Sequence, residues 1–221
     1  MTPEAQLANL NTGVAQRPAL RGVLHLGTAV AATAGAAWLL LLASSPTGYV
    51  GAAVFGTSLI LLYWTSAGYH RITWGPIMRR VLKRLDHAMI FVLIAGTYTP
   101  LAFQISPKWW IPMLSVIWGL AGAGALMKAV WPDAPRWLSV TLYIALGWVG
   151  VVAVTEIVGE FPISFLTLLG VGGAFYTLGG IVYALRRPDP WPRVFGYHEI
   201  FHSMVVAGSA FHFALVAGYV L

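Results

Sequence analysis

Five polar side chains in this sequence have the types and the spacing of a metal site. Ser66 precedes His70 by four residues, His198 precedes His202 by four, and Asp86 lies between the two pairs. Residues four apart lie on one face of an α-helix, so each pair can act as one unit. Imidazole and carboxylate groups within apolar helices are costly unless they pair, line a cavity or bind a ligand.

The residue types favour zinc. Three imidazoles with one open position form an arrangement that zinc uses in catalysis, and a chain without cysteine must hold a metal through His, Asp or Glu. We therefore expect Zn²⁺ ligands at His70, His198 and His202. Asp86 would be a fourth ligand or would accept a proton from metal-bound water. Ser66 would orient a ligand or donate a hydrogen bond to an oxyanion.

Two alternatives stay open at this point. Iron or another divalent ion also suits imidazole and carboxylate ligands. Taken singly, a histidine near a helix end is more often an interfacial or hydrogen-bonded residue than a ligand. The predicted metal site depends on the whole set of five residues.

Composition indicates the elements that must position this set. Hydrophobic residues make up 58% of the 221 residues and charged residues only 9%, with a mean hydropathy of +0.76. These values predict an all-α polytopic membrane protein, a bundle of seven transmembrane helices. The expected spans are roughly 23–43, 49–70, 87–105, 111–130, 137–156, 163–185 and 198–220.

The basic residues indicate topology and argue against a nucleic-acid partner. The net charge is +6, but Lys and Arg interrupt the apolar spans and do not coat one soluble face. Of the 13 basic residues, only Lys108 is assigned to the opposite side, so the positive-inside rule predicts a cytoplasmic N-terminus and a C-terminus outside. Residues 1–21 are expected to form a flexible cytoplasmic tail, and residues 22–221 a single membrane domain.

The predicted topology brings the five residues to one depth. The second span ends at His70, the third begins near Asp86, and the seventh begins with His198 and His202, all at the cytoplasmic side. Convergence of the four groups assumes that these three helices are neighbours.

The remaining histidines carry weaker expectations. His212 lies about 15 Å along its helix from His202, so a hydrogen-bonded or cavity-lining role is favoured over metal ligation. His87 points about 100° away from Asp86, which favours an interfacial or helix–helix contact. The role of His25, at the start of the first span, is undetermined from the sequence.

The chain resembles the hemolysin III and progestin and adipoQ receptor superfamily, in particular its bacterial branch. The matching segments are RPALRGVLHL from Arg17, SAGYHRI from Ser66, RLDHAMIFVLIAGTYTP from Arg84 and HEIFHSMVVAGSAFHF from His198. The resemblance implies seven membrane helices and an intramembrane zinc site near the cytoplasm. It also implies that the three histidines bind zinc, that Asp86 contacts it through water, and that Ser66 lies close by.

Three classes of function follow from the residues and the resemblance. Similarity to alkaline ceramidases implies zinc-dependent hydrolysis of a lipid amide or ester, which is the leading hypothesis. The second hypothesis is a receptor-like or lipid-homeostasis protein in which zinc is structural. The third is a pore-forming, cytolytic protein, as the hemolysin name suggests. In each case the expected partners are membrane lipids or a lipid-like ligand, and the expected location is the bacterial inner membrane.

Overall fold

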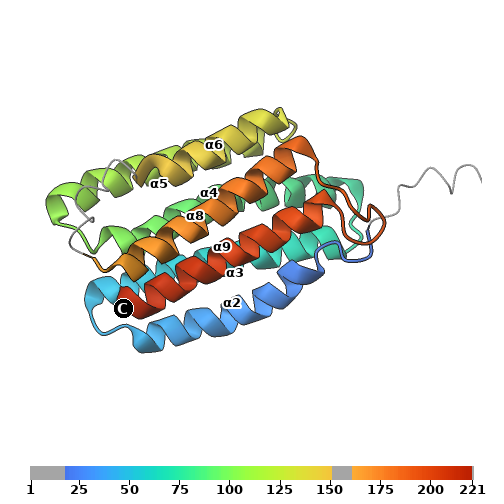
Figure 1. The fold of residues 1–221 in the computed structure, drawn as a ribbon. Helices are drawn as coiled ribbons and strands as arrows, with labels where there is room; N and C mark the ends of the chain where they lie inside the picture. The colour runs from blue at the N-terminus through green and yellow to red at the C-terminus, as the bar shows by residue number, and fades with distance from the viewer. Residues whose placement is uncertain (1–17, 151–160, 221) are drawn as a thin grey trace, which may run out of the picture.

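The computed structural model describes residues 18–150 and 161–220, and the regular elements of this part of the chain are helices. Seven helices follow one another along the described chain (Figure 1). They are α2 (Val23–Leu42), α3 (Pro46–Arg71), α4 (Pro76–Ala102), α5 (Pro107–Val130), α6 (Arg136–Trp148), α8 (Ile163–Leu185) and α9 (Tyr197–Tyr219). The prediction of an all-helical chain is confirmed.

Six of these helices are long and apolar enough to cross a membrane, which identifies an integral membrane protein. The exception is α6, which has 13 residues. Its expected span, 137–156, continues into residues 151–160, which lie outside the described residues, as does most of the expected tail 1–21. Seven spans and the orientation of the chain therefore stay predictions.

The helix that carries Asp86 begins about ten residues earlier than the sequence pattern predicted. Pro76 occupies its first turn, where proline's fixed φ suits a helix start and its missing N–H costs no hydrogen bond. The hydropathy pattern left the first part of α4 out of the expected span because this part carries four basic residues. Arg and Lys are nevertheless good helix formers. Asp86 consequently lies in the third turn of α4 and not at its beginning.

The helices form a ring in which each packs on its neighbour along the chain. The strongest packing joins α2 to α3, α3 to α4, α4 to α5, and α8 to α9. The ring closes where α2 packs on α9 and α6 on α8, so the first and last described helices lie side by side (Figure 1). A smaller contact joins α4 to α9, which brings the helix of Asp86 to the helix of His198 and His202.

Two apolar clusters hold the ring together. The larger one joins α2, α3, α4 and α9 around the fully buried Phe55 and Tyr63 of α3. The smaller one joins α4 to α5 and α6 around Phe91 and Ile117. Because α4 contributes to both clusters, it is the wall between the two halves of the ring, and its position fixes where Asp86 lies.

A close approach between α3 and α4 depends on Gly96. A Cβ atom added at Gly96 would lie only 2.6 Å from the Cβ atom of Ser58, and it would also overlap the Ser58 hydroxyl. Small residues at such contacts let membrane helices pack with their backbones close together. Gly96 therefore permits the spacing at which Asp86 of α4 meets the end of α3.

We predict that Gly96→Ala lowers the free energy of unfolding by about 1–3 kcal/mol, because the added methyl overpacks this contact. The measurement is thermal unfolding of the detergent-solubilised protein followed by circular dichroism. Gly119→Ala is the matched control, since a Cβ there meets nothing within 4 Å, and it should be neutral or stabilising by up to about 1 kcal/mol. Equal melting temperatures for the two variants would contradict the packing argument, and Ser58→Gly should partly rescue Gly96→Ala.

Candidate metal centre

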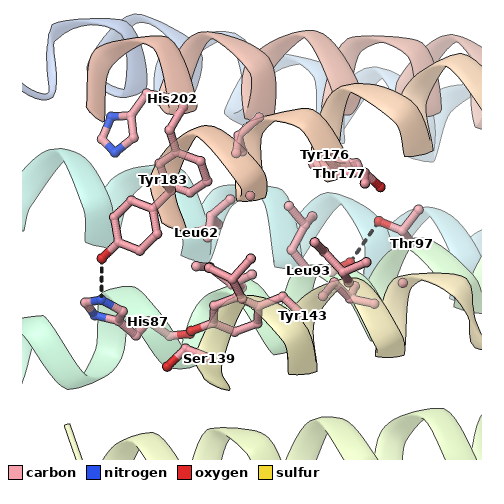
Figure 2. Close-up of a pocket in the computed structure, with 18 of the residues that line it drawn as sticks. Leu62, His87, Leu93, Thr97, Ser139, Tyr143, Tyr176, Thr177, Tyr183 and His202 are labelled. Atoms are coloured by element: carbon pink, nitrogen blue, oxygen red, sulfur yellow. Dashed lines mark hydrogen bonds between the residues drawn. The ribbon is translucent and has the colours of Figure 1, made fainter. Parts of the chain in front are cut away.

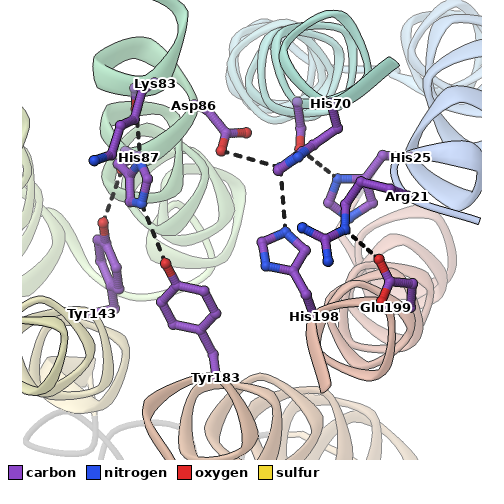
Figure 3. A network of polar contacts seen from close by, with 11 residues as sticks. Arg21, His25, His70, Lys83, Asp86, His87, Tyr143, Tyr183, His198 and Glu199 are labelled. Atoms are coloured by element: carbon purple, nitrogen blue, oxygen red, sulfur yellow. Dashed lines mark hydrogen bonds and ion pairs between the residues drawn. The ribbon is translucent and has the colours of Figure 1, made fainter. Parts of the chain in front are cut away.

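Three histidines from two helices converge at one end of the ring. His70 lies in the last turn of α3, and His198 and His202 occupy successive turns at the start of α9. One ring nitrogen from each lies within 4.8 Å of the others, which is close enough for a shared metal ion. The structure thus brings together residues that are 128 positions apart in the chain (Figure 3).

The geometry of this histidine cluster fits a tetrahedral ion. His198 Nε2 and His70 Nε2 face each other at 3.3 Å. With Zn–N bonds of about 2.05 Å and tetrahedral angles, two coordinating nitrogens lie about 3.3 Å apart. The His202 ring lies beside both, with ring centroids 4.4 Å from His198 and 5.1 Å from His70. The donor set could therefore hold a metal ion, and one of its nitrogen pairs has the spacing of two tetrahedral ligands.

Asp86 and Ser66 complete the group that the sequence singled out. The Asp86 Oδ2 atom lies 3.7 Å from His70 Nε2, and its side chain is mostly covered. Ser66 lies one turn deeper than His70 on the same face of α3, where only 2% of its surface is exposed, and its side chain also interacts with Asp86. All five residues therefore lie together at one end of the ring.

The first helix supplies a further residue to the site. His25 Nδ1 lies 2.8 Å from Ser66 Oγ, and the His25 ring stacks on His202 with centroids 3.7 Å apart and planes 8° from parallel. Its Nε2 atom is buried without a hydrogen-bond partner among the described residues. The sequence signal that could have indicated a role for His25 is the cost of placing an imidazole within an apolar span. Its contacts could not be predicted, because they require α2 to lie beside α9.

A buried ion pair fixes that placement of α2. The Arg21 guanidinium binds the Glu199 carboxylate, whose side chain is 2% exposed, and Glu199 Oε2 also accepts a hydrogen bond from the Gly196 backbone N–H at 2.9 Å. The chain then turns through Gly22, where φ is +75° and a Cβ would lie 2.7 Å from the Cβ of His70. Position 22 therefore requires glycine, both because φ is positive and because a side chain would collide with His70. This Arg21–Glu199 pair holds the start of α2 against the histidine cluster.

His87 makes the helix–helix contact expected for it. Tyr143 of α6 donates a hydrogen bond to the His87 carbonyl oxygen at 3.1 Å, and the Tyr183 hydroxyl of α8 lies 3.5 Å from His87 Nε2. Its own Nδ1 lies 2.7 Å from the Lys83 carbonyl oxygen. His87 thus faces α6 and α8 while Asp86 faces the histidine cluster (Figure 3).

His212 also lies where it was expected, away from the cluster. Its Nε2 lies 3.2 Å from the Leu169 carbonyl oxygen, and the side chain is buried. The imidazole packs against Tyr176, whose hydroxyl lies 2.7 Å from Ser209 Oγ. Tyr63 donates a second hydrogen bond to Ser209 at 2.6 Å. Together these side chains form a second, smaller polar group deeper in the bundle.

A single large cavity joins the histidine cluster to that deeper polar group. Its volume is about 930 Å³, within the range that encloses a small organic ligand. His70, Asp86, His202 and His212 all line this cavity. In Figure 2, His202 lies toward one end and Thr97 and Tyr176 toward the other, with Leu62 and Leu93 between them. The arrangement can present a polar reacting group to the cluster while an apolar tail is held among the helices.

Comparison with known proteins supports this arrangement at the level of the whole chain. The family model described as "Haemolysin-III related" matches residues 14–213. The chain is 33% identical to the hemolysin-3 homolog of Bacillus subtilis (strain 168) over 192 residues, which covers 86% of this chain and 82% of that protein. It is 35% identical to hemolysin-3 of Bacillus cereus over 170 residues, covering 76% and 74% of the two chains.

A more distant similarity extends to the adiponectin receptor protein of Drosophila melanogaster, which is 28% identical over 169 residues that cover 67% of this chain and 37% of that protein. The chain is 34% identical over 149 residues to the heptahelical transmembrane protein ADIPOR1 of rice, covering 60% of this chain and 40% of that protein. The family model spans nearly all of the helical chain, including every residue of the histidine cluster. This protein therefore belongs to the haemolysin-III related family of integral membrane proteins.

Proposed function

We propose that this protein is a zinc-dependent membrane hydrolase that cleaves an amide or an ester bond of a lipid. One observation carries the proposal: three imidazoles, a carboxylate and a hydroxyl converge at one end of a large, mainly apolar cavity. A site that only held helices together would not need this cavity beside it. A lipid could place its carbonyl group at the cluster and its acyl chain among the apolar side chains.

His70, His198 and His202 would hold the zinc ion. Bound there, zinc would polarise a carbonyl oxygen and make water a better nucleophile at neutral pH. The chain itself supplies three ligand side chains, which leaves a position for water or substrate, as in catalytic zinc sites.

Asp86 would be the proton acceptor. Its Oδ2 atom lies 3.7 Å from His70 Nε2, which is too far for a direct hydrogen bond but suits contact through one water molecule. A carboxylate in this position can orient the attacking water and remove its proton, then return a proton to the leaving nitrogen or oxygen.

Ser66 would stabilise the oxyanion that forms when the carbonyl is attacked. Its hydroxyl is buried beside His25, and a hydroxyl can donate one hydrogen bond while it accepts another. If His25 Nδ1–H donates a hydrogen bond to Ser66 Oγ, the serine hydroxyl keeps its own hydrogen. It could donate this hydrogen to Asp86 in the free protein and to the oxyanion when substrate is bound. His25 would then be a positioning residue, which acts through Ser66 and by stacking on His202.

We place the histidine cluster on the cytoplasmic side of a bacterial inner membrane. Most basic residues gather at the end of the ring that carries the cluster, which by the positive-inside rule favours that side and a cytoplasmic N-terminus. Substrate would then come from the inner leaflet of the bilayer.

A second candidate is a lipid-sensing protein with a structural metal. The three histidines join α3 to α9 across the ring, and an ion there would hold the two helices together whether or not a reaction takes place. The receptor name of the Drosophila relative agrees with this reading. The two candidates differ in the role of Asp86, which only the hydrolase requires.

The metal content of the protein provides the first test of the proposed hydrolase. Purified wild-type protein should contain about one zinc ion per chain by inductively coupled plasma mass spectrometry, and His202→Ala should lose it, because two imidazoles bind zinc too weakly. His212→Ala removes an equally buried imidazole from the other end of the cavity and should keep the zinc. A wild-type protein without zinc, or a His202→Ala variant that retains it, would remove the basis of the mechanism.

The next prediction separates catalysis from a structural role. Asp86→Asn should keep the zinc and the melting temperature but lower turnover at least about a hundredfold, as expected when a general base is lost. Fatty acid release from a panel of lipid amides and esters is the measurement. Asp189→Asn is the control and should leave turnover unchanged, because this carboxylate does not line the cavity and an amide oxygen can still accept the hydrogen bond from the Tyr197 backbone N–H. Failure of the wild-type protein to release any product would favour the structural metal.

The role of His25 can be tested with a double-mutant cycle. Ser66→Ala should lower turnover about a hundredfold, as removal of an oxyanion donor does in other hydrolases. His25→Phe keeps an aromatic ring over His202 but cannot bind Ser66, and should lower turnover with the zinc retained. Because His25 acts through Ser66, the double variant should be no slower than Ser66→Ala alone. Multiplicative losses would show that His25 has only a structural role.

A further inference from the structure

The cavity wall opposite the histidine cluster contains a buried cation. Lys128 lies in the last turn of α5, where only 2% of its surface is exposed, and it lines the cavity. Its ammonium group donates a hydrogen bond to Ser139 Oγ at the start of α6, and Ser139 is equally buried. The partner of this charge is therefore a neutral hydroxyl.

No carboxylate among the described residues makes an ion pair with Lys128. Asp133 acts on it only from a longer distance, and that carboxylate already binds Lys83. The other contacts between basic side chains and carboxylates in this part of the chain are Arg21–Glu199 and His70–Asp86, and neither involves Lys128. A buried ammonium group without an opposite charge is strongly destabilising. The positive-inside rule accounts for basic residues near this membrane surface, but not for one that is folded inward against the cavity. An anion that enters the cavity would compensate the charge.

The other charged side chains that line the cavity also favour an anionic ligand. Six cationic side chains line it, against two carboxylates, Asp86 and Asp133. The cations are Arg21, Arg79, Lys83, Lys128, Arg136 and Arg186. The excess of positive charge attracts anions to this end of the cavity.

Several of the other cations already have partners. Arg21 binds Glu199, and the Arg136 guanidinium lies 4.7 Å from the centre of the Tyr183 ring. Lys83 donates a hydrogen bond to Asp133 at 2.6 Å, and this contact holds the pKa of the exposed Asp133 carboxyl below its ordinary value. Lys128 is the most buried of the six and has no such partner within the described chain.

The position of Lys128 along the length of the bundle can be compared with that of Asp86 in the proposed catalytic site. Tyr143 of α6 contacts the His87 carbonyl of α4, which aligns the two helices at that point. Ser139 lies one turn before Tyr143 and Lys83 one turn before His87, so the Lys128–Ser139 pair lies roughly 5 Å nearer the basic end of the bundle than Asp86 does. This offset is measured along the helices, and Lys128 also lies across the cavity from the histidine cluster. A ligand with its anionic group at Lys128 and its carbonyl group at the cluster would therefore span the width of the cavity.

We propose that Lys128, held by Ser139, binds the phosphate group of an anionic lipid whose acyl chain occupies the apolar part of the cavity. The substrate class then becomes a phosphate-bearing lipid that also contains an ester or amide bond. This last step rests on the proposed hydrolase function, whereas the phosphate site does not. The mainly apolar lining beyond the cluster favours a lipid over free phosphate.

The probe for this site is dodecyl phosphate, which has no amide or carboxylic ester to cleave. Its binding to purified protein in a neutral maltoside detergent is measured by isothermal titration calorimetry, beside dodecanol and inorganic phosphate. We expect dodecyl phosphate to bind at least about tenfold more tightly than either of the other two. Equal binding of dodecanol would overturn the anion site, and equal binding of inorganic phosphate would overturn its assignment to a lipid.

Variants of the chain locate the site. Lys128→Met keeps the length of the side chain without its charge and should weaken dodecyl phosphate binding at least about tenfold, as loss of a charged hydrogen bond does. Lys128→Arg should bind within a few fold of wild type. Arg80→Met removes a charge from the same end of the bundle, at a position that does not line the cavity, and should have no effect. Equal binding by Lys128→Met and wild type, at equal melting temperatures, would overturn the proposal.

A second variant covers a Lys128→Met protein that does not fold, and lipid hydrolysis assays separate the phosphate site from the proposed hydrolase function. If Lys128→Met does not fold, Lys83→Met tests the same end of the cavity and should also weaken binding, with an unchanged affinity counting against the site. Phosphate binding without hydrolysis of any lipid would leave the site standing and overturn the hydrolase. Hydrolysis of neutral lipids without dodecyl phosphate binding would do the reverse.

Discussion

The cost of placing ionisable groups among apolar helices is the constraint on which the rest of this structure depends. Three imidazoles and a carboxylate can lie in such surroundings only if each finds a partner, and the partners available are one another, a metal ion and a ligand. The His70–His198 and His70–Asp86 contacts answer this requirement directly. The close packing of α3 on α4 at Gly96, and the turn at Gly22, bring the groups near enough to do so.

The cost of burying ionisable groups also accounts for the different polar groups on the two sides of the cavity. One side, from α2, α3 and α9, carries the histidine cluster and His25. The other side, from α4, α5, α6 and α8, carries Asp86, His87, several tyrosine hydroxyls and most of the cations. Tyr143 and Tyr183 both turn toward His87, so the polar atoms of this second side are largely used among themselves. Lys128 also binds a residue of this side, Ser139, but the hydroxyl is neutral and does not compensate the charge of the ammonium group.

Much of the site could be predicted from local spacing and topology, because both act within single helices. The four-residue intervals at Ser66 and His198 place side chains on one face, and the alternating direction of the spans places those faces at one end. His25 and Lys128 were missed because their importance depends on which helices are neighbours and which way a long side chain folds, and neither leaves a periodic signal in one sequence. The early start of α4 was missed because hydropathy does not register a helix that continues beyond the apolar layer.

The Arg21–Glu199 pair has a consequence for the order in which the molecule is made. Its two members are separated by 178 residues, and the last histidines leave the ribosome with Glu199, long after α2 and α3 have been inserted in the bilayer. Until then His25, Ser66 and His70 lie in an incomplete bundle that cannot bind zinc through three imidazoles. Insertion of α9 would therefore close the ring and bring the three histidines together in one event, so that an unfinished chain would lack the proposed metal site.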